Sequence, residues 1–89
     1  MLQIAYTSRA AGSFGEADYN SLIGQARSNN ERDGLTGLIL FDGSRFLQAI
    51  EGPKASTSHC MARIASDGRH HDIDIVKQGD IRDRDFANF

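Results

Sequence analysis

The sequence has one cysteine, one proline and no tryptophan among its 89 residues. A single cysteine excludes an internal disulfide framework and fits a reducing compartment. No run approaches the roughly 20 apolar residues that a membrane-spanning helix needs. The N-terminus also lacks the basic and apolar pattern of a signal peptide. We therefore expect a cytoplasmic protein that has no membrane partner.

A strong excess of either charge is also missing. Ten basic and twelve acidic residues give a net charge of −2, so electrostatics offers no reason to expect nucleic acid as a partner. Hydrophobic residues make up 39% and charged residues 25%, which is ordinary for a globular protein. The length is that of one small domain, so we expect a single domain over residues 1–89.

Hydrophobic periodicity and turn signals predict the element order βαββαβ. Ser13 and Glu16 form a capping-box pattern, which predicts Ser13 as an N-cap, and the continuous apolar run at 35–41 predicts a strand buried on both faces. Strands are expected at 2–8, 35–41, 45–51 and 71–78, and helices from Ser13 to near 29–30 and over 54–66. This order is typical of a ferredoxin-like α+β sandwich, with a mixed sheet and two helices on one face.

Two polar side chains stand on faces that are otherwise apolar. Gln48 alternates with Phe46 and Ile50, and Tyr6 follows Ile4 on the first strand. A buried carboxamide needs partners for its donors and acceptors. The alternatives are an edge-strand glutamine facing solvent and a core tyrosine with its hydroxyl at the rim. If their strands are neighbours, Tyr6 and Gln48 meet.

Further polar residues follow helical spacings. Asn29 and Asn30 continue the apolar stripe of the first helix, where they either cap its end or present amides to a ligand. Arg63 and Asp67 stand four residues apart on the second helix. They form either a weak surface ion pair or one polar wall of a site between the helices.

Residue patterns for metal binding or catalysis are not found. Adjacent His70 and His71 in a strand point to opposite faces, and His59 stands alone, so no metal site is expected. Cys60 lies on an apolar stripe and is expected to be a small buried hydrophobe. There is no phosphate loop, nucleophile elbow or catalytic triad. We therefore expect a protein that is not an enzyme.

Several segments in order resemble the BLUF family, the sensors of blue light using flavin. The resemblance extends over nearly the whole chain and is strongest where LTG and a hairpin turn precede FLQAIEG. The matching segments are Ala5-Tyr6-Thr7-Ser8, Asn29-Asn30, Leu35-Thr36-Gly37-Leu38, Phe46 to Gly52 and Asp67-Gly68-Arg69-His70, and the segment from Ile81 to Phe89 resembles the one before the family's last strand.

The resemblance implies an oxidised flavin, usually FAD and otherwise FMN, held noncovalently between the two helices. It makes Tyr6 the donor of an electron and then a proton to the excited flavin. Gln48 would bridge tyrosine and flavin and then rearrange, by rotation or tautomerisation. The remaining implied contacts are Asn29 and Asn30 at the polar ring edge, Arg63, Asp67 and His70 at the carbonyl edge or ribityl chain, and Leu22, Phe46 and Ile64 as apolar walls.

One departure from the family concerns the end of the chain. The family has a fifth strand with a tryptophan or methionine near the glutamine, whereas this sequence ends at Phe89. We therefore expect a domain truncated before its final strand, with its signal passing to a separate effector protein or domain. An uncovered sheet edge would also favour a homodimer.

Two other functions remain open on the residues alone. An acylphosphatase-like hydrolase could use Arg9 and Asn30, although the loop at 10–12 lacks a phosphate-cradling pattern. A cofactor-free interaction module could keep the same fold, although Tyr6, Asn30 and Gln48 argue against it.

Overall fold

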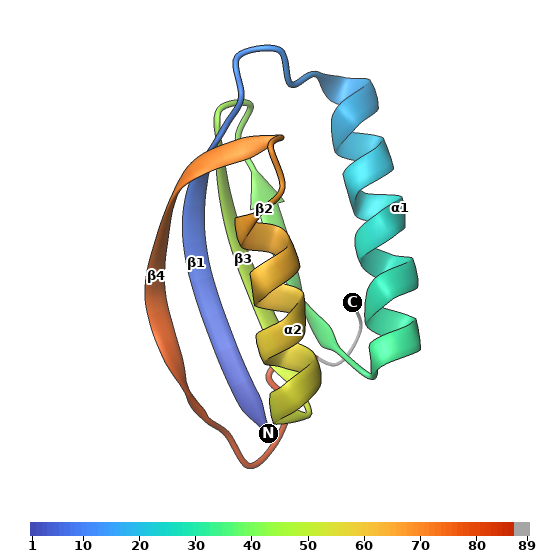
Figure 1. Ribbon diagram of the computed structural model, residues 1–89, viewed down its shortest axis with the longest axis vertical. Coiled ribbons are helices and arrows are strands. Elements are labelled where there is room, and N and C mark those ends of the chain that lie inside the picture. The colour runs from blue at the N-terminus through green and yellow to red at the C-terminus, as the bar shows by residue number, and fades with distance from the viewer. Residues whose placement is uncertain (87–89) are drawn as a thin grey trace.

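The computed structural model describes residues 1–86 as a four-stranded sheet with two helices on one face (Figure 1). The elements are β1 (Leu2–Ala10), α1 (Glu16–Asp33), β2 (Thr36–Phe41), β3 (Arg45–Gly52), α2 (Lys54–Ala65) and β4 (His70–Asp80). The sheet order is β2-β3-β1-β4. The predicted element order and the ferredoxin-like α+β class are confirmed.

The predicted mixed sheet is wrong for the described strands, because all three of their pairings are antiparallel. Each helix connects two parallel strands, but those strands are not neighbours. β3 lies between β1 and β2, and β1 lies between β3 and β4. The crossovers therefore leave one strand between each parallel pair, and every adjacent pair runs in opposite directions.

Helix α1 begins later and ends later than predicted. Its N-cap is Gly15 rather than Ser13, because the Asp18 carboxylate accepts the Gly15 N–H at 2.9 Å. At the other end, Gly34 takes the left-handed conformation with φ 71° and donates its N–H to the Asn30 carbonyl. The helix therefore continues to Asp33, one turn beyond the asparagines.

Strand β2 lies at the sheet edge and is not buried on both faces, which corrects the prediction for residues 35–41. Leu38 is 36% exposed and Leu40 is 52% exposed. Both pair with β3 residues on the face away from the helices, where Leu47 is also 38% exposed. A continuous apolar run does not distinguish a central strand from an edge strand with an uncovered face.

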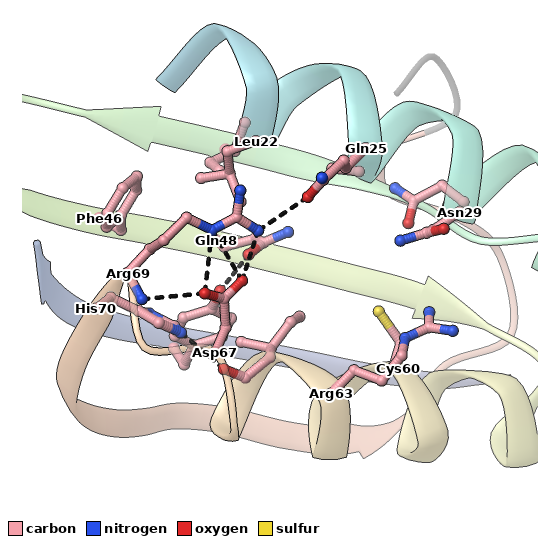
Figure 2. Close-up of a pocket in the computed structure, with 15 residues that line it drawn as sticks. Leu22, Gln25, Asn29, Phe46, Gln48, Cys60, Arg63, Asp67, Arg69 and His70 are labelled. Atoms are coloured by element: carbon pink, nitrogen blue, oxygen red, sulfur yellow. Dashed lines mark hydrogen bonds and ion pairs between the residues drawn. The ribbon is translucent and has the colours of Figure 1, made fainter. Parts of the chain in front are cut away.

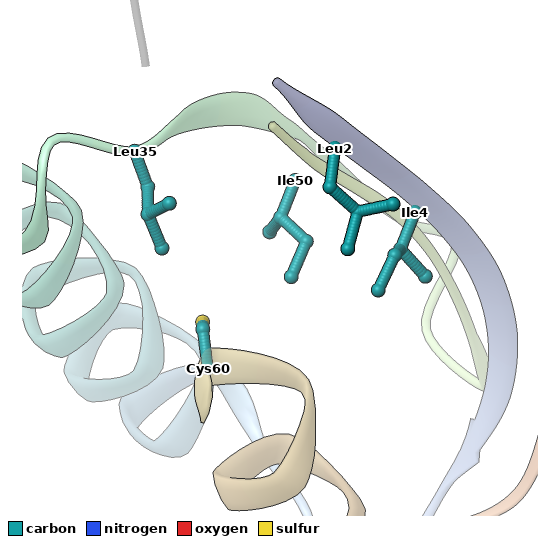
Figure 3. Close-up of a cluster of buried hydrophobic side chains, with 5 residues drawn as sticks. All are labelled: Leu2, Ile4, Leu35, Ile50 and Cys60. Atoms are coloured by element: carbon teal, nitrogen blue, oxygen red, sulfur yellow. The ribbon is translucent and has the colours of Figure 1, made fainter. Parts of the chain in front are cut away.

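The hydrophobic core occupies one end of the space between the sheet and α2. Figure 3 shows Leu2 and Ile4 of β1 and Ile50 of β3 on the same side of the sheet, facing Cys60 of α2. Leu35, just before β2, completes this buried cluster. Tyr6 and Gln48 lie further along β1 and β3 on the same face, beyond the core.

The close packing of β2 on β3 gives the first prediction. A Cβ atom added to Gly37 would lie 2.0 Å from the backbone oxygen of Ala49, so Gly37→Ala must push the two strands apart. We expect the unfolding free energy to fall by roughly 1–3 kcal/mol or more. The control Gly24→Ala adds a methyl group with no neighbour within 4 Å on a helix and should stabilise the protein by about 0.4–1 kcal/mol. Urea unfolding that ranks the two variants in the opposite order would contradict the packing described.

The expected truncation at Phe89 lies outside the described residues. Within residues 1–86, no helix is both long enough and apolar enough to cross a membrane.

Candidate functional site

A cavity of about 230 Å³ lies between α1, α2 and the helix-covered face of the sheet (Figure 2). Its lining consists of Tyr6, Leu22, Gln25, Ala26, Asn29, Asn30, Ile39, Phe46, Gln48, Cys60, Arg63, Ile64, Asp67, Arg69 and His70. Asn30 is the one buried residue of α1, an 18-residue helix. The side chains of α1 at Leu22, Ala26 and Asn30 therefore face this cavity.

Tyr6 and Gln48 form a hydrogen-bonded pair at the floor of the cavity. They are direct partners in the β1–β3 ladder, and the Tyr6 hydroxyl donates to the Gln48 Oε1. Both are buried, with 2% and 7% of their surface exposed. The solvent-facing alternative for Gln48 is therefore wrong, because β3 is a central strand. With Oε1 occupied, the two N–H groups of Gln48 remain to meet another acceptor.

The environment of Tyr6 keeps its phenol protonated. Burial is the main cause that raises its pKa above the ordinary value, and the nearby Cys60 and Asp67 act in the same direction. A neutral phenol is an O–H donor, whereas a phenolate could only accept. Tyr6 can therefore donate its hydrogen bond to Gln48 over the whole physiological pH range.

Asn30 brings an amide into the cavity from the end of α1. Its backbone carbonyl accepts the N–H groups of Gly34 and Leu35, which fixes this last turn. Its side chain is only 3% exposed, and its Nδ2 has no hydrogen-bond partner within residues 1–86. An unsatisfied buried donor costs roughly 1–3 kcal/mol. This atom is therefore positioned to donate to a ligand in the cavity.

Two arginines connect the cavity walls. Arg69 donates to both carboxylate oxygens of Asp67 and also to Gln25 Oε1 of α1 at 3.0 Å (Figure 2). The hydrogen bond from Arg69 is the main cause that lowers the pKa of Asp67. Arg63 pairs with Asp33 at 3.2 Å, and Asp67 pairs with Arg69. The ion pair between Arg63 and Asp67 that the helical spacing suggested is therefore wrong.

His70 has protein partners at both ring nitrogens. Nε2 lies 2.7 Å from the Ile64 carbonyl, and Nδ1 lies 2.8 Å from the Ser8 hydroxyl. Because a carbonyl can only accept, Nε2 carries a proton and donates it. His70 therefore joins the end of α2 to β1, and its ring lines the cavity 6.1 Å from the ring of Tyr6.

All ten site residues expected from the sequence lie in the lining of this one cavity. The lining also includes residues that were not assigned to the site: Gln25, Ala26, Ile39, Cys60 and Arg69. Gln25 stands three residues from Leu22 and four from Asn29, a helical spacing that could have identified it. Ile39 is the β2 partner of Gln48, which only the strand register reveals.

The chemistry of the lining favours a flat ligand with apolar faces and a polar edge. Leu22, Phe46 and Ile64 offer apolar surface, and the amides of Asn30 and Gln48 offer donors. No cluster of three or more His, Cys, Asp or Glu suited to a metal ion occurs in the described part of the chain. The lining thus offers apolar surface and hydrogen-bonding groups to an organic ligand.

Comparisons with known proteins agree on one family. The family model "BLUF: Sensors of blue-light using FAD" matches residues 1–89. The alpha subunit of photoactivated adenylate cyclase from Euglena gracilis is 30% identical over 88 residues, which are 99% of this chain and 9% of that protein. This chain therefore spans about a tenth of the length of that relative.

Solved structures show the same similarity. A bacterial light-regulated adenylyl cyclase superposes with a TM-score of 0.95 at 30% identity, over 100% of this chain and 26% of the other. BlrB, a BLUF protein in its dark state, gives a TM-score of 0.91 at 32% identity, over 96% of this chain and 64% of the other. The chain belongs to the BLUF family and is a flavin-binding, blue-light photoreceptor domain.

Proposed function

We propose that this chain binds oxidised FAD noncovalently in the cavity between α1, α2 and the sheet. Light then drives the transfer of an electron and a proton from Tyr6 to the flavin. A rearrangement of the Gln48 hydrogen bonds passes the signal to a partner. The chain turns over no substrate of its own. The observation that carries this proposal is the buried Tyr6–Gln48 hydrogen bond on the floor of a cavity that also receives the unpartnered Asn30 amide.

The flavin ring fits the residues present. It is flat, with apolar faces and an edge of carbonyl and ring-nitrogen acceptors that suits the free amide hydrogens of Asn30 and Gln48. At about 230 Å³ the cavity is slightly smaller than the roughly 300–1,000 Å³ of drug-sized ligand sites. The cavity would therefore hold the ring system, which FAD and FMN share.

When bound, the flavin supplies blue-light absorption and an excited state that accepts an electron. Tyr6 supplies a phenol that stays protonated, and it is already hydrogen-bonded to the amide that must move. Gln48 can exchange its oxygen and nitrogen ends with little change in shape. It is therefore the two-state element of the switch, with each state set by which of its atoms meets Tyr6.

We propose a separate effector as the partner of this domain. Two of the relatives named above are adenylate cyclases under light control, so an effector of that kind is one candidate. The exposed leucines of β2 and β3, Leu38, Leu40 and Leu47, lie on the sheet face away from the helices and offer apolar contact area. A homodimer through a sheet edge is a second candidate assembly.

The arrangement does not favour an acylphosphatase-like hydrolase. That activity would need Arg9 and Asn30 to meet around one anion. Arg9 instead lines a separate groove with Asp72 and Asp74, whereas Asn30 lines the cavity. The side-chain pair that the hydrolase requires is therefore split between two sites.

Flavin uptake tests the binding part of the proposal. Titration of flavin-free protein followed by flavin fluorescence should give dissociation constants for FAD and FMN within about tenfold of each other. Asn30→Leu should raise both dissociation constants by roughly 2–10-fold, because it removes one neutral hydrogen bond. Asn20→Leu, on the outer side of α1 and absent from the cavity lining, is the control. Failure of the chain to take up either flavin would contradict the proposal.

A further inference from the structure

The one cysteine of the chain, Cys60, lines the cavity between α1, α2 and the sheet, and the proposed photochemistry does not use it. It stands three residues before Arg63 and four before Ile64 on α2, so these side chains share the helix face that lines the cavity. Figure 2 shows the sulfur of Cys60 pointing from α2 toward α1. The thiol forms no disulfide and is 6% exposed. A free thiol therefore stands in the cavity where we propose that flavin binds.

A second buried group at the same end of the cavity points to a ligand there. Leu35 belongs to the same buried cluster as Cys60 and donates its N–H to the Asn30 carbonyl, so both residues flank the core end of the cavity. The Asn30 side chain is 3% exposed, and its Nδ2 has no partner among residues 1–86. A buried donor is expected to have an acceptor, which a bound molecule can supply. Cys60 thus borders a space that receives a ligand as well as the closed core.

Access and charge decide what the thiol can react with. Arg63, one turn further along α2, has 35% of its side chain exposed, so the cavity wall beside Cys60 reaches solvent. Burial is the main cause that raises the pKa of Cys60, and a hydrogen bond with Arg63 acts in the opposite direction. Because the thiolate is the nucleophile, Cys60 should react more slowly than an exposed thiol. The apolar surface of Leu22 and Phe46 favours an uncharged reagent.

We propose that Cys60 is a modification site for small disulfides inside the cavity, and that its modification and flavin binding exclude each other. The inference rests on the proposed function, because it takes flavin as the excluded ligand. In the reaction, the thiol loses its proton and its sulfur attacks one sulfur of the disulfide. A new S–S bond forms, the old one breaks, and the leaving thiolate takes up the proton. Cys60 is oxidised and the small disulfide is reduced, so no further reactant is needed.

The size of the cavity makes the two events exclusive. At about 230 Å³ it is already smaller than the roughly 300–1,000 Å³ of drug-sized ligand sites. A group bonded to the Cys60 sulfur projects into this volume, and the flavin ring needs the same volume. Flavin-free protein therefore loses its capacity for flavin in the presence of small disulfides and regains it in the presence of small thiols. The redox state of the surroundings thus controls how much of the protein can sense light.

Reaction of the flavin-free chain with dithiodipyridine, a small uncharged disulfide, tests the modification site. Absorbance follows the released thiopyridone. Because the chain has one cysteine, the signal reports on Cys60 alone and should reach one thiopyridone per folded chain. The rate should stay constant in low urea, since reaction through the cavity needs no unfolding. No reaction before unfolding, or a rate that rises with urea in proportion to the unfolding equilibrium constant, would overturn the site.

A relocated thiol is the matched control for the effect of flavin. Cys60→Ala combined with Ser58→Cys moves the thiol to an exposed position of the same helix, outside the cavity lining. Saturating FAD should slow the reaction of Cys60 roughly tenfold or more and leave that of the relocated thiol unchanged. Equal rates for Cys60 with and without bound FAD, or equal slowing of both thiols, would overturn the exclusion.

Titration of the modified protein with FAD tests the exclusion in the reverse direction. By thermodynamic linkage, its affinity for FAD should fall roughly tenfold or more, and dithiothreitol should restore the affinity of the untreated protein. Equal affinity before and after modification would overturn the exclusion and leave the photoreceptor function intact. If the untreated protein takes up no flavin, the proposed function fails and the exclusion fails with it, whereas the reaction of the flavin-free chain still decides the modification site.

Discussion

Gln48→Leu is expected to keep its flavin and to lose the light-induced spectral shift. Leucine has a volume similar to that of glutamine, so it still fills this part of the cavity floor. The variant loses the amide that accepts the Tyr6 hydrogen bond and that we propose donates to the flavin edge. One neutral hydrogen bond contributes about 0.5–1.5 kcal/mol, so flavin affinity should fall by no more than roughly tenfold. Absorbance before and after blue light measures the shift, and flavin fluorescence measures the affinity.

A matched control separates the role of Gln48 from a general effect of the substitution. Gln78→Leu makes the same change on β4, at an exposed position next to Ile4 in the sheet. It should retain the full spectral shift. A normal light response in Gln48→Leu would remove Gln48 from the mechanism, and loss of the response in both variants would point to damage of the sheet.

Tyr6→Phe is expected to bind flavin and to show no light-induced shift. Phenylalanine keeps the ring in place but removes the O–H group that supplies the proton. The substitution also leaves the buried Oε1 of Gln48 without its donor, which should lower the unfolding free energy by roughly 1–3 kcal/mol. Absorbance under illumination and urea unfolding measure the two effects.

Tyr19 provides the control, because it is the other tyrosine of the chain. It lies on α1, outside the cavity lining, with its ring stacked on Phe41 at a centroid distance of 5.3 Å. Tyr19→Phe preserves that stacking and should leave the light response unchanged. An unaltered response in Tyr6→Phe would exclude Tyr6 as the essential donor.

The sequence predicted the element order because it depends on local patterns, whereas most of the expected site residues came from the family resemblance. Alternating apolar residues identify strands whatever their position in the sheet. Gln48 stood out as a polar residue on an apolar face, and Asn30 as an amide on a helix stripe. Both signals are local, because each is a polar side chain at a position where the strand or helix pattern is otherwise apolar.

Features that depend on long-range pairing could not be predicted in this way. Leu38 and Leu40 looked buried because hydrophobicity does not report which strand lies at the edge. Arg63 pairs with Asp33 and not with Asp67, because α1 continues to Asp33 and brings the Asp33 carboxylate close to α2. The buried carboxylate of Glu51 gave no signal in the sequence either, since its backbone donors come from a segment 34 and 35 residues later.

The light-minus-dark absorbance spectrum of the flavin-bound protein tests the central claim most directly. We predict a flavin spectrum that shifts to longer wavelength under blue light and returns in the dark, because a rearranged Gln48 strengthens a hydrogen bond to the flavin edge. A bound flavin whose spectrum is unchanged by blue light would contradict it.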